Sequence, residues 1–384
     1  MPTIHWLGTG LSTVPGIRRL AVGDLPLVLW NRTVEKAHAA IEGLDTNAQV
    51  REFDLETVGA AIEPGDIVVS MLPGTWHVPV AQLAIEKEAH FVSSSYISKE
   101  MAALDKEASY YKLSLVNEVG LDPGIDHLMA HGLVDRYRDS AQFDPANTIR
   151  FRSFCGGFPK IPNDFRYKFS WSPLGVLKAL RSPARSIRDG DVVDTARPWH
   201  ALSDYEARLP GGSETFQAYP NRDSLPFMSA YHFDPDWQVD EFVRGTLRLN
   251  GWSDAWAEIF SEIETLEGEA GDARLQEMSD DLWRTQSYDE GEPDRVVLCV
   301  ELEARSDDKA VWHHSHVIDA SGNESGSAMG RLVSLPVSLA IEAIAAGKIS
   351  AGVSAAPSDT TIIKHWFDVL RSHGDEIHLI DHLS

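Results

Sequence analysis

Short apolar segments alternate with helix-compatible segments through residues 3–137. Six apolar runs predict strands at residues 3–7, 27–30, 50–53, 67–71, 91–92 and 113–116. The stretches between and after them favour helices, including residues 77–87, 99–108 and about 126–137. The run at 67–71 is almost wholly apolar, as expected of a parallel strand buried on both faces. The alternation therefore predicts an α/β fold with a doubly wound parallel sheet of six β-units.

The pattern changes after residue 137, where strands with glycine and proline turns become more common. Strands are expected at residues 149–155, ending at Cys155-Gly156-Gly157, and at 242–249, where polar and apolar residues alternate. Residues 296–304 and 311–320 predict a hairpin, whereas residues 174–180 and 251–285 predict helices. This section is expected to form an α+β domain with a mixed or antiparallel sheet, and its exposed strands suggest a homodimer contact.

Composition limits the classes of protein to consider. With 384 residues, of which 43% are hydrophobic, the chain can form two globular domains. It has no run of about 18 apolar residues and no basic and apolar leader, so neither a membrane span nor a secretory signal is expected. Because Cys155 and Cys299 are its only cysteines, a cytoplasmic location is expected rather than a disulfide scaffold.

The net charge adds a further limit. A formal charge of −24 repels phosphate backbones and anionic lipid, so no nucleic-acid or membrane partner is expected. The same charge makes an anionic substrate harder to attract. Any site for such a substrate should therefore contain local arginines.

A glycine pair follows the first strand directly. Gly8-Thr9-Gly10 precedes a helix-compatible stretch that Pro15-Gly16 interrupts. In a dinucleotide-binding turn, the first glycine allows the tight turn and the second lets the backbone approach a pyrophosphate. Thr13 occupies the third glycine position, so the fingerprint is incomplete and a plain turn is the alternative. In the context of six β-units, the motif predicts a Rossmann-type domain that binds a nicotinamide dinucleotide.

The last part of the chain is expected to complete this domain. Residues 330–345 form a long apolar stretch that predicts a helix, and with residues 348–384 it should return to the first domain. We therefore predict a dinucleotide-binding domain at residues 1–127 and 330–384. Residues 128–329 are predicted to form the substrate-binding domain.

The end of the second strand indicates which dinucleotide binds. It carries Asn31-Arg32-Thr33, where a site for NAD usually has an acidic residue that holds the ribose hydroxyls. Arginine and threonine suit a 2′-phosphate, so NADP is predicted and NAD remains possible. Alternatively, Thr33 caps the next helix and Arg32 is solvated.

The stretch from Val116 to His127 contains the strongest candidate chemistry. Three carboxylates, an amide and an imidazole crowd into this glycine- and proline-containing stretch between an apolar strand and a helix. A loop held by a rigid scaffold is a common place for catalytic residues. The alternative is that Asp122-Pro123-Gly124 is only turn chemistry and that Asp126 is a helix cap.

A metal site is not expected. His313, His314 and His316 lie on one predicted strand, but His313 points to the opposite face from the other two. Cys299 lies in the hairpin partner, and no paired-cysteine or His-Glu-x-x-His spacing is present.

Six motifs together resemble the glutamate-forming saccharopine dehydrogenases, also called saccharopine reductases. The resemblance spans about residues 3–350 and rests on residues 94–98, 117–127, 155–157, 167–173, 219–224 and 244–248, in that order. It implies a Rossmann domain, a substrate domain with a mixed sheet, and a place in lysine metabolism. The chain departs from the usual family opening at Leu11-Ser12-Thr13.

The resemblance also implies a reaction. A hydride would leave the lysine-side carbon next to the secondary amine of saccharopine, and hydrolysis of the imine would give glutamate and 2-aminoadipate 6-semialdehyde. Hydride transfer needs a neutral amine, and water must be activated to attack the imine. Asp122, Tyr96 and Cys155 are the titratable groups nearest the expected domain junction and are the catalytic candidates.

The candidate binding residues follow from the motifs and from their places at strand ends. For the cofactor they are Gly8, Gly10, Leu11, Ser12, Asn31, Arg32, Thr33, Asp54, Leu55, Leu72, Pro73, Ser95, Val119, Leu121 and Trp171. For the substrate they are Tyr96, Asp122, Gly157, Trp171, Arg222, Arg244, Gly245 and Thr246. Arg222 and Arg244 are expected to bind carboxylates of saccharopine, although either could form a structural ion pair.

Two alternatives stay open at this point. The first is a related amino-acid or polyamine-precursor dehydrogenase, such as a carboxynorspermidine or lysine dehydrogenase, which would need fewer carboxylate partners. The second is a non-catalytic Rossmann protein that binds the cofactor within an assembly. Turnover of saccharopine would separate both from the main hypothesis.

Overall fold

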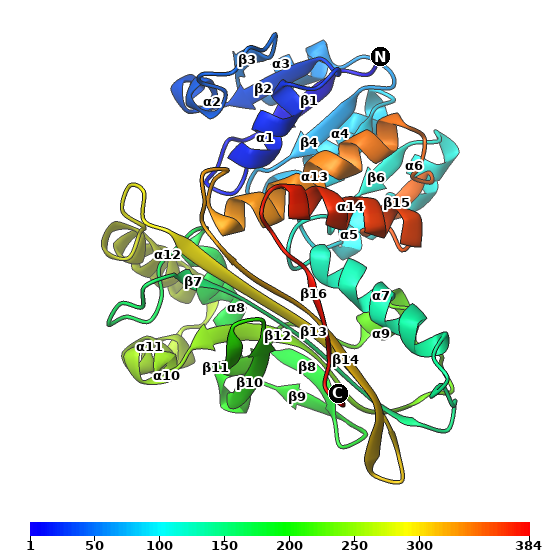
Figure 1. The fold of residues 1–384 in the computed structure, drawn as a ribbon. Coiled ribbons are helices and arrows are strands. Elements are labelled where there is room, and N and C mark those ends of the chain that lie inside the picture. The colour runs from blue at the N-terminus through cyan, green and yellow to red at the C-terminus, as the bar shows by residue number, and fades with distance from the viewer. The chain divides into compact units, whose positions relative to one another are not determined.

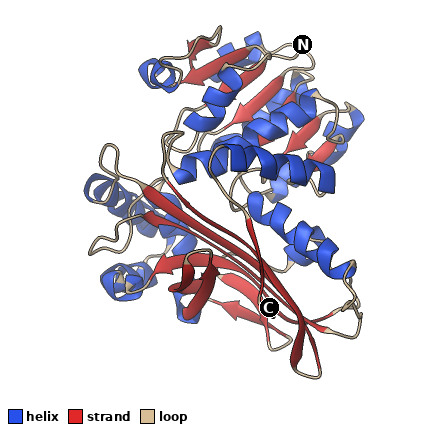
Figure 2. Cartoon of the chain, viewed as in Figure 1, coloured by secondary structure: helices blue, strands red, loops and turns tan.

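The alternation of strands and helices is present in the computed structural model, which describes residues 1–384. The chain forms two units, the first of residues 1–128 and 324–373 and the second of residues 129–323 and 374–384. Figures 1 and 2 show the two late helices α13 (Ala328–Ala345) and α14 (Thr360–Ser372) lying with the N-terminal elements. The first unit is therefore assembled from both ends of the chain.

The first unit contains a seven-stranded parallel sheet. Its strands are β1 (Ile4–Leu7), β2 (Leu27–Asn31), β3 (Gln49–Glu52), β4 (Ile67–Ser70), β5 (His90–Ser93), β6 (Ser114–Val116) and β15 (Gly352–Ser354). They follow the order β15-β6-β5-β4-β1-β2-β3, which is the doubly wound arrangement that the sequence predicts. The seventh strand, β15, was not predicted as a strand.

Helices connect these strands. They are α1 (Val14–Ala21), α2 (Val34–Ala40), α3 (Leu55–Ala61), the short 3-10 helix η1 (Gly74–Trp76), α4 (His77–Glu86), α5 (Lys99–Ala102), α6 (Asp105–Tyr110) and the start of α7 (Ile125–Arg138). All four residues of β4 are buried, as its apolar run predicts. A hydrophobic cluster that includes Leu7, Trp30 and Phe91 covers one face of the sheet. Each such side chain stabilises the fold by roughly 1.5–3 kcal/mol when fully buried.

The second unit contains a mixed sheet. Its strands are β7 (Thr148–Pro159), β8 (Ala184–Arg188), β9 (Asp191–Thr195), β10 (Ser203–Leu209), β11 (Gly212–Pro220), β12 (Gln238–Leu249), β13 (Asp294–Ser306), β14 (Lys309–Ser321) and β16 (His378–Asp381). The main path is β10-β11-β12-β7-β13-β14-β16, in which only β12 and β7 run parallel. Figure 2 shows the long strands of this sheet in red.

Helices of the second unit cover parts of this sheet. They are the rest of α7, α8 (Pro173–Arg181), η2 (Pro198–Ala201), α9 (Pro226–Ala230), α10 (Trp252–Ala255), α11 (Ala257–Thr265) and α12 (Gly268–Thr285). The segment 251–285, predicted as helical, is thus three helices. A core rich in tryptophan joins α8, α10, α11 and α12 around Trp252 and Trp256.

Two predictions about this unit need correction. Residues 374–384 were expected in the first domain, but they belong to the second unit because β16 pairs antiparallel with β14. The strand at 149–155 was expected to end at Cys155-Gly156-Gly157, but β7 continues to Pro159. The strand continues through Gly156 because residues on both sides of it pair with β13. Without a side chain, Gly156 also allows close contact with β12. A Cβ there would lie 2.6 Å from the Leu247 carbonyl oxygen.

One helix needs a comment about membranes. Helix α13 is long and apolar enough to cross a membrane by length and composition, with a mean hydropathy of 1.5. Of that segment, 78% is buried inside the protein. It packs against α1, where Gly16 allows close contact because a Cβ there would lie 2.3 Å from the Ser334 carbonyl oxygen. Burial of this kind is typical of a core helix.

Candidate active site

The glycine turn after β1 lies against the end of β4. Gly8 has a positive φ of 96°, and a Cβ there would lie 2.9 Å from the Met71 carbonyl oxygen. Only glycine fits this position without strain. Gly10 is exposed, with no atom within 4 Å of where its Cβ would be. The turn therefore leaves open backbone in front of the N-terminus of α1, where a phosphate can approach.

The side chain of Asn31 joins this turn to the end of β2. Its Oδ1 accepts a hydrogen bond from the Thr9 backbone N–H at 3.2 Å, and its Nδ2 donates to the Thr33 carbonyl at 2.8 Å. Arg32 is exposed and makes no hydrogen bond or ion pair. Thr33 stands at the N-cap of α2 but its side chain makes no capping bond. The alternative role of Thr33 as a cap is thus supported by position only.

The end of β3 carries the next candidates. Asp54 caps α3, and its Oδ2 accepts hydrogen bonds from the Thr57 backbone N–H at 2.9 Å and from the Thr57 hydroxyl at 2.8 Å. These hydrogen bonds lower the pKa of Asp54. Leu55, expected to contact the cofactor, packs partly buried against the core of the first unit.

These residues fit a bound nicotinamide dinucleotide phosphate. The Gly8 position has no room for a side chain, and the Thr9 hydroxyl is buried without a hydrogen-bond partner. An orphaned buried hydroxyl is unusual in proteins and marks a place where a ligand can supply the missing bond. Arg32, without a partner, is a cation at the end of the neighbouring strand. Leu11 is 60% exposed in the turn and Ser12 is partly exposed.

A buried histidine, not singled out from the sequence, links two strand ends. His77 accepts or donates hydrogen bonds to the Ser70 hydroxyl at 2.8 Å and to the Ser95 hydroxyl at 2.8 Å. Burial lowers the pKa of His77 to about 4, so the ring is neutral at physiological pH. It thereby fixes Ser95, a predicted cofactor contact, to the end of β4.

The predicted catalytic turn folds back tightly on itself. The Gly120 N–H donates to the Pro123 carbonyl at 2.9 Å, and the Ile125 N–H donates to the Gly120 carbonyl at 2.9 Å. Gly124 has a φ of 148°, and a Cβ there would lie 2.1 Å from the Gly120 oxygen. Asp126 caps the turn from within, because its Oδ1 accepts from the Gly124 N–H at 2.6 Å. Helix α7 begins at Ile125, so Asp126 lies inside the helix, and the interpretation of Asp126 as its N-cap is wrong.

Asp122 and Tyr96 come together at this turn. The Tyr96 hydroxyl donates a hydrogen bond of 3.1 Å to Oδ1 of Asp122, and both side chains are partly exposed. The loop that carries Tyr96 is fixed by Glu118, whose Oε1 accepts from the Ile97 N–H at 2.9 Å. The other oxygen of Glu118 lies 3.0 Å from Nε2 of the buried His127. Two of the three catalytic candidates thus form one hydrogen-bonded pair on a rigid support.

Four other predicted cofactor contacts differ in exposure. Val119 and Leu121 are buried, with 0% and 4% of their surfaces exposed, so their side chains are core. The exposed fraction includes the backbone, so these two cofactor contacts stay predictions. Leu72 is partly buried against the core, and Pro73 is exposed after β4.

The second unit places several predicted substrate residues on one face of its sheet. Arg244 and Thr246 lie two residues apart on β12 and therefore share a face. Their partners on β7 are Ser153 and Cys155. Cys155, Gly157 and Thr246 are partly exposed between mostly buried neighbours. The third catalytic candidate, Cys155, thus lies beside the predicted substrate contacts of the second unit.

The two predicted carboxylate-binding arginines differ. Arg222 is exposed and has a positive φ of 59°, and its carbonyl accepts from the Arg185 N–H at 2.8 Å. Arg244 is only 3% exposed, and its guanidinium carbon lies 3.9 Å from the centre of the Phe227 ring. Ser224 joins the two segments, because its Oγ accepts from the Arg244 N–H at 3.0 Å.

Two predicted contacts have evident packing roles. A Cβ on Gly245 would lie 2.4 Å from the Tyr219 carbonyl oxygen, so this glycine lets β11 and β12 pair closely. Trp171 is 43% exposed, and its ring lies against Gly175 at the start of α8, where a Cβ would be 2.5 Å away. Trp171 thus packs on Gly175 with part of its ring and exposes the rest to solvent.

A further arginine of β12 was missed by the site prediction. Arg248 is 6% exposed and pairs with no carboxylate, and its guanidinium lies 4.7 Å from the centre of the Tyr167 ring and 5.3 Å from that of Trp252. Cation–π contacts with these rings stabilise the buried charge. Tyr219 interacts with the side chains of Thr246 and Arg248. Arg248 therefore supports the strand that carries Thr246.

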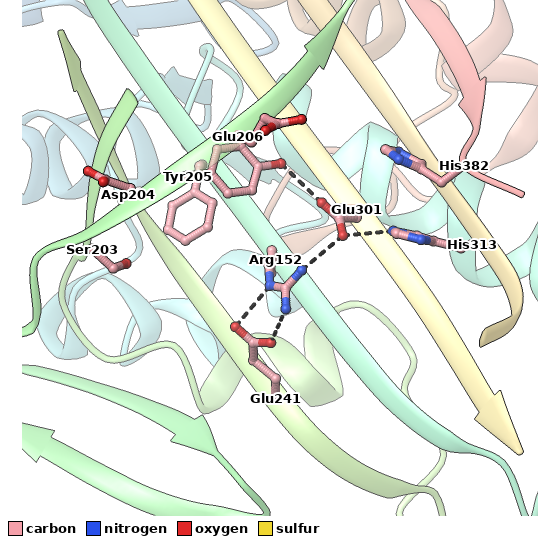
Figure 3. Close-up of a pocket in the computed structure, with 10 residues that line it drawn as sticks. Arg152, Ser203, Asp204, Tyr205, Glu206, Glu241, Glu301, His313 and His382 are labelled. Carbon is pink, nitrogen blue, oxygen red and sulfur yellow. Dashed lines mark hydrogen bonds and ion pairs between the residues drawn. The ribbon is translucent and has the colours of Figure 1, made fainter. Parts of the chain in front are cut away.

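The opposite face of this sheet carries a polar pocket of about 450 Å³. Figure 3 shows Arg152 between Glu241 and Glu301, and Glu301 also accepts hydrogen bonds from the Tyr205 hydroxyl at 3.0 Å and from His313 at 2.8 Å. Burial would raise the pKa of Glu301, but the bond from His313 and the charge of Arg152 lower it to about 2. These charges satisfy one another, as a structural ion network does. No group of three or more potential ligands is arranged to hold a metal ion.

A parallel doubly wound unit with an open glycine turn, joined in one chain to a mixed-sheet unit, defines a two-domain protein of the nucleotide-binding class. Comparison with known families agrees. Residues 4–113 match the saccharopine dehydrogenase NADP binding domain, and residues 120–375 match the saccharopine dehydrogenase C-terminal domain. The chain belongs to the saccharopine dehydrogenase family.

Individual relatives share this assignment. The chain is 35% identical over 256 residues to saccharopine dehydrogenase (NADP(+), L-glutamate-forming) of Pyricularia oryzae, a match that covers 65% of this chain and 55% of that protein. The Saccharomyces cerevisiae enzyme of the same name is 34% identical, with 64% and 54% covered. These matches thus span about half the length of the curated relatives.

Solved structures show the same fold. Apo saccharopine dehydrogenase (L-Glu forming) from S. cerevisiae matches with a TM-score of 0.78 and 25% identity, covering 99% of this chain and all of that one. Homospermidine synthase from Legionella pneumophila, solved with NAD, matches with a TM-score of 0.66 at 12% identity, and so shares the fold alone.

Proposed function

We propose that this protein is an oxidoreductase that oxidises the lysine-side C–N bond of saccharopine. With NADP⁺ and water, the products are L-glutamate, 2-aminoadipate 6-semialdehyde, NADPH and a proton. The observation that carries this proposal is the presence of both family domains, in order, on one chain. The Tyr96–Asp122 pair on the first unit supports it, because the reaction needs a group that accepts a proton.

Residues of the first unit are proposed to bind the cofactor. Backbone N–H groups near Gly10 and the N-terminus of α1 suit the pyrophosphate, and Arg32 with Thr33 suits a 2′-phosphate. A bound nicotinamide ring supplies the hydride acceptor. We favour NADP over NAD because Arg32 is exposed without an acidic partner.

Asp122 is proposed to accept the proton that the secondary ammonium group must lose before its carbon can give up a hydride. Oδ1 of Asp122 accepts a hydrogen bond from Tyr96, which holds the carboxylate at the end of β6. Hydride loss gives an iminium, to which water adds with loss of a proton. The hydroxyl of the resulting carbinolamine then loses its proton as the C–N bond breaks, and the glutamate nitrogen keeps the electron pair and takes up a proton.

Arginines of the second unit are proposed to bind the carboxylates of the substrate. Arg222 is the first candidate because the residue is exposed and lies in a family motif, and a guanidinium can form a bidentate pair with a carboxylate. Arg244 is the second, and Cys155 and Thr246 lie on the same face of β7 and β12. Cys155 is the alternative proton acceptor if Asp122 proves to be only a turn residue.

The experiment is a substrate panel with the purified chain and both cofactors. Formation of reduced cofactor with saccharopine, together with release of glutamate and a semialdehyde, supports the proposal. Release of lysine and 2-oxoglutarate would show that the opposite C–N bond is cleaved. Turnover of a smaller amino acid but not of saccharopine would favour a related dehydrogenase, and cofactor binding with no turnover would favour a non-catalytic role.

A further inference from the structure

Trp76 is an exposed aromatic residue at the edge of the sheet where the glycine turn lies. It is the last residue of η1, which follows the loop after β4, and 37% of its surface is exposed. Other tryptophans of the first unit, Trp6 and Trp30, are fully buried. An indole left on the surface beside a candidate nucleotide site therefore needs an explanation.

The position of Trp76 is fixed by two contacts. Its backbone N–H donates to the Pro73 carbonyl at 2.9 Å. Its ring packs edge to face on Phe53, with ring centres 5.5 Å apart and planes at 85°. An edge-to-face contact engages the ring at its rim or on one side. It therefore leaves indole surface for another flat group.

A short chain of contacts connects Trp76 to the residues proposed to hold the cofactor. The Phe53 N–H donates to the Asn31 carbonyl at 3.2 Å, and Asn31 precedes Arg32. The segment that leads to Trp76 also touches the glycine turn, because Gly8 packs against the Met71 carbonyl. Strands β4 and β3 are separated by β1 and β2 in the sheet. Trp76 follows β4 and Phe53 follows β3, so their contact passes over the ends of β1 and β2. The glycine turn follows β1, and Arg32 follows β2.

We propose that the exposed indole of Trp76 is the stacking platform for the adenine ring of the dinucleotide. This assignment rests on the proposed cofactor role of the first unit and adds a residue to it. Adenine stacks well on an indole because both are flat, polarisable ring systems. Arg32 lies at the neighbouring strand end, where a 2′-phosphate of the same nucleotide would bind. The platform thus recognises the base, and Arg32 recognises the phosphate.

The test uses adenosine nucleotides that lack nicotinamide, so it does not depend on turnover. Binding of 2′,5′-ADP and of 5′-AMP to the full chain is measured by calorimetry. The key variant is Trp76→Leu, which keeps an apolar contact with Phe53 but removes the aromatic face. Trp76→Phe retains a smaller aromatic face, and Trp283→Leu is the matched control because Trp283 is 41% exposed in the second unit.

We expect Trp76→Leu to lower the affinity for both nucleotides by roughly tenfold, because one base–aromatic stack is lost. Trp76→Phe should keep most of the affinity, and Trp283→Leu should bind as the wild type does. If the wild type and Trp76→Leu bind the nucleotides with equal affinity, Trp76 is not the platform. That result would not contradict the proposed oxidation of saccharopine. Failure of the wild type to bind either nucleotide would overturn it too, and would also remove the proposed cofactor site.

Discussion

The hydroxyl of Tyr96 lies 3.1 Å from Oδ1 of Asp122, and it joins the loop after β5 to the turn after β6. The two residues are 26 positions apart in the chain, yet both follow parallel neighbouring strands. Carboxyl ends of adjacent parallel strands meet at one edge of a sheet. The pair is therefore a product of the doubly wound topology and not of local sequence.

Asp122→Asn should lower the turnover number by roughly 10²–10⁴-fold, the usual contribution of a general base. The Michaelis constant should change much less, because an amide can still make a hydrogen bond in the same place. The measurement is steady-state kinetics with saccharopine and NADP⁺. Tyr96→Phe serves as the comparison and should cost less, since it only removes a hydrogen bond to the carboxylate. A loss below about threefold in Asp122→Asn would leave Cys155 as the next candidate.

Arg222→Ala should raise the Michaelis constant for saccharopine while leaving the melting temperature nearly unchanged. The side chain is exposed, so solvent screening limits the expected loss to roughly 1–2 kcal/mol of binding free energy. Arg244→Ala is the contrasting variant, because its buried guanidinium packs on Phe227 and its loss should lower the melting temperature. If Arg222→Ala instead melts early and keeps its Michaelis constant, Arg222 is structural.

In the first unit, the sequence predicts those elements whose conformation is set by neighbouring residues. The apolar run of β4 and the glycine turn after β1 carry enough information by themselves, since few other conformations suit them. β15 was missed because only three residues form it, and it exists through pairing with β6. β16 was assigned to the wrong unit for a similar reason, because its pairing with β14 is a long-range contact that local sequence does not specify.

Site residues follow the same division. A polar turn after a buried strand is a local signal that singled out Asp122, whereas Tyr96 was singled out by the family motif at residues 94–98; the catalytic role of both stays a prediction. His77 was missed because a lone histidine at the start of a helix gives no sign of the two serines that it connects. Arg248 was missed as well, since its aromatic surroundings come from three separate segments.

His77 should make stability depend on pH in the range between its two pKa values. Its pKa is about 4 in the folded chain and 6.5 for a histidine in water, so the unfolded chain binds a proton first as the pH falls. Its contribution is therefore intact above about pH 6.5 and is lost progressively toward pH 4, by on the order of 3 kcal/mol. In His77→Gln, urea unfolding should show a shallower decline over this range. The exposed His38→Gln is the control, and an unchanged slope in His77→Gln would contradict the assignment.

Glu301 should make the free energy of unfolding depend on pH in a lower range than His77 does. Its pKa is lowered from 4.5 to about 2 in the folded chain, so its stabilising contribution is complete above 4.5 and is lost as the pH falls toward 2. The loss should be on the order of 3 kcal/mol, since the carboxylate is buried between Arg152 and His313. Acid unfolding of Glu301→Gln should depend less steeply on pH in this window than that of the wild type. The exposed Glu290→Gln should keep the wild-type profile, and equal slopes in all three proteins would rule out a dominant role for Glu301.

The choice of cofactor should depend on Arg32. No acidic residue stands at the end of β2 to hold ribose hydroxyls, and the exposed guanidinium can pair with a 2′-phosphate through two donors. We expect kcat/KM to be higher with NADP⁺ than with NAD⁺. Arg32→Ala should lower the value for NADP⁺ by roughly 10- to 100-fold and change that for NAD⁺ little, because a charge-assisted pair contributes about 1.5–3 kcal/mol. Arg51→Ala, also exposed and one strand away, is the matched control. If the wild type prefers NAD⁺, or if Arg32→Ala slows both cofactors equally, Arg32 does not bind the phosphate and can act only by stacking.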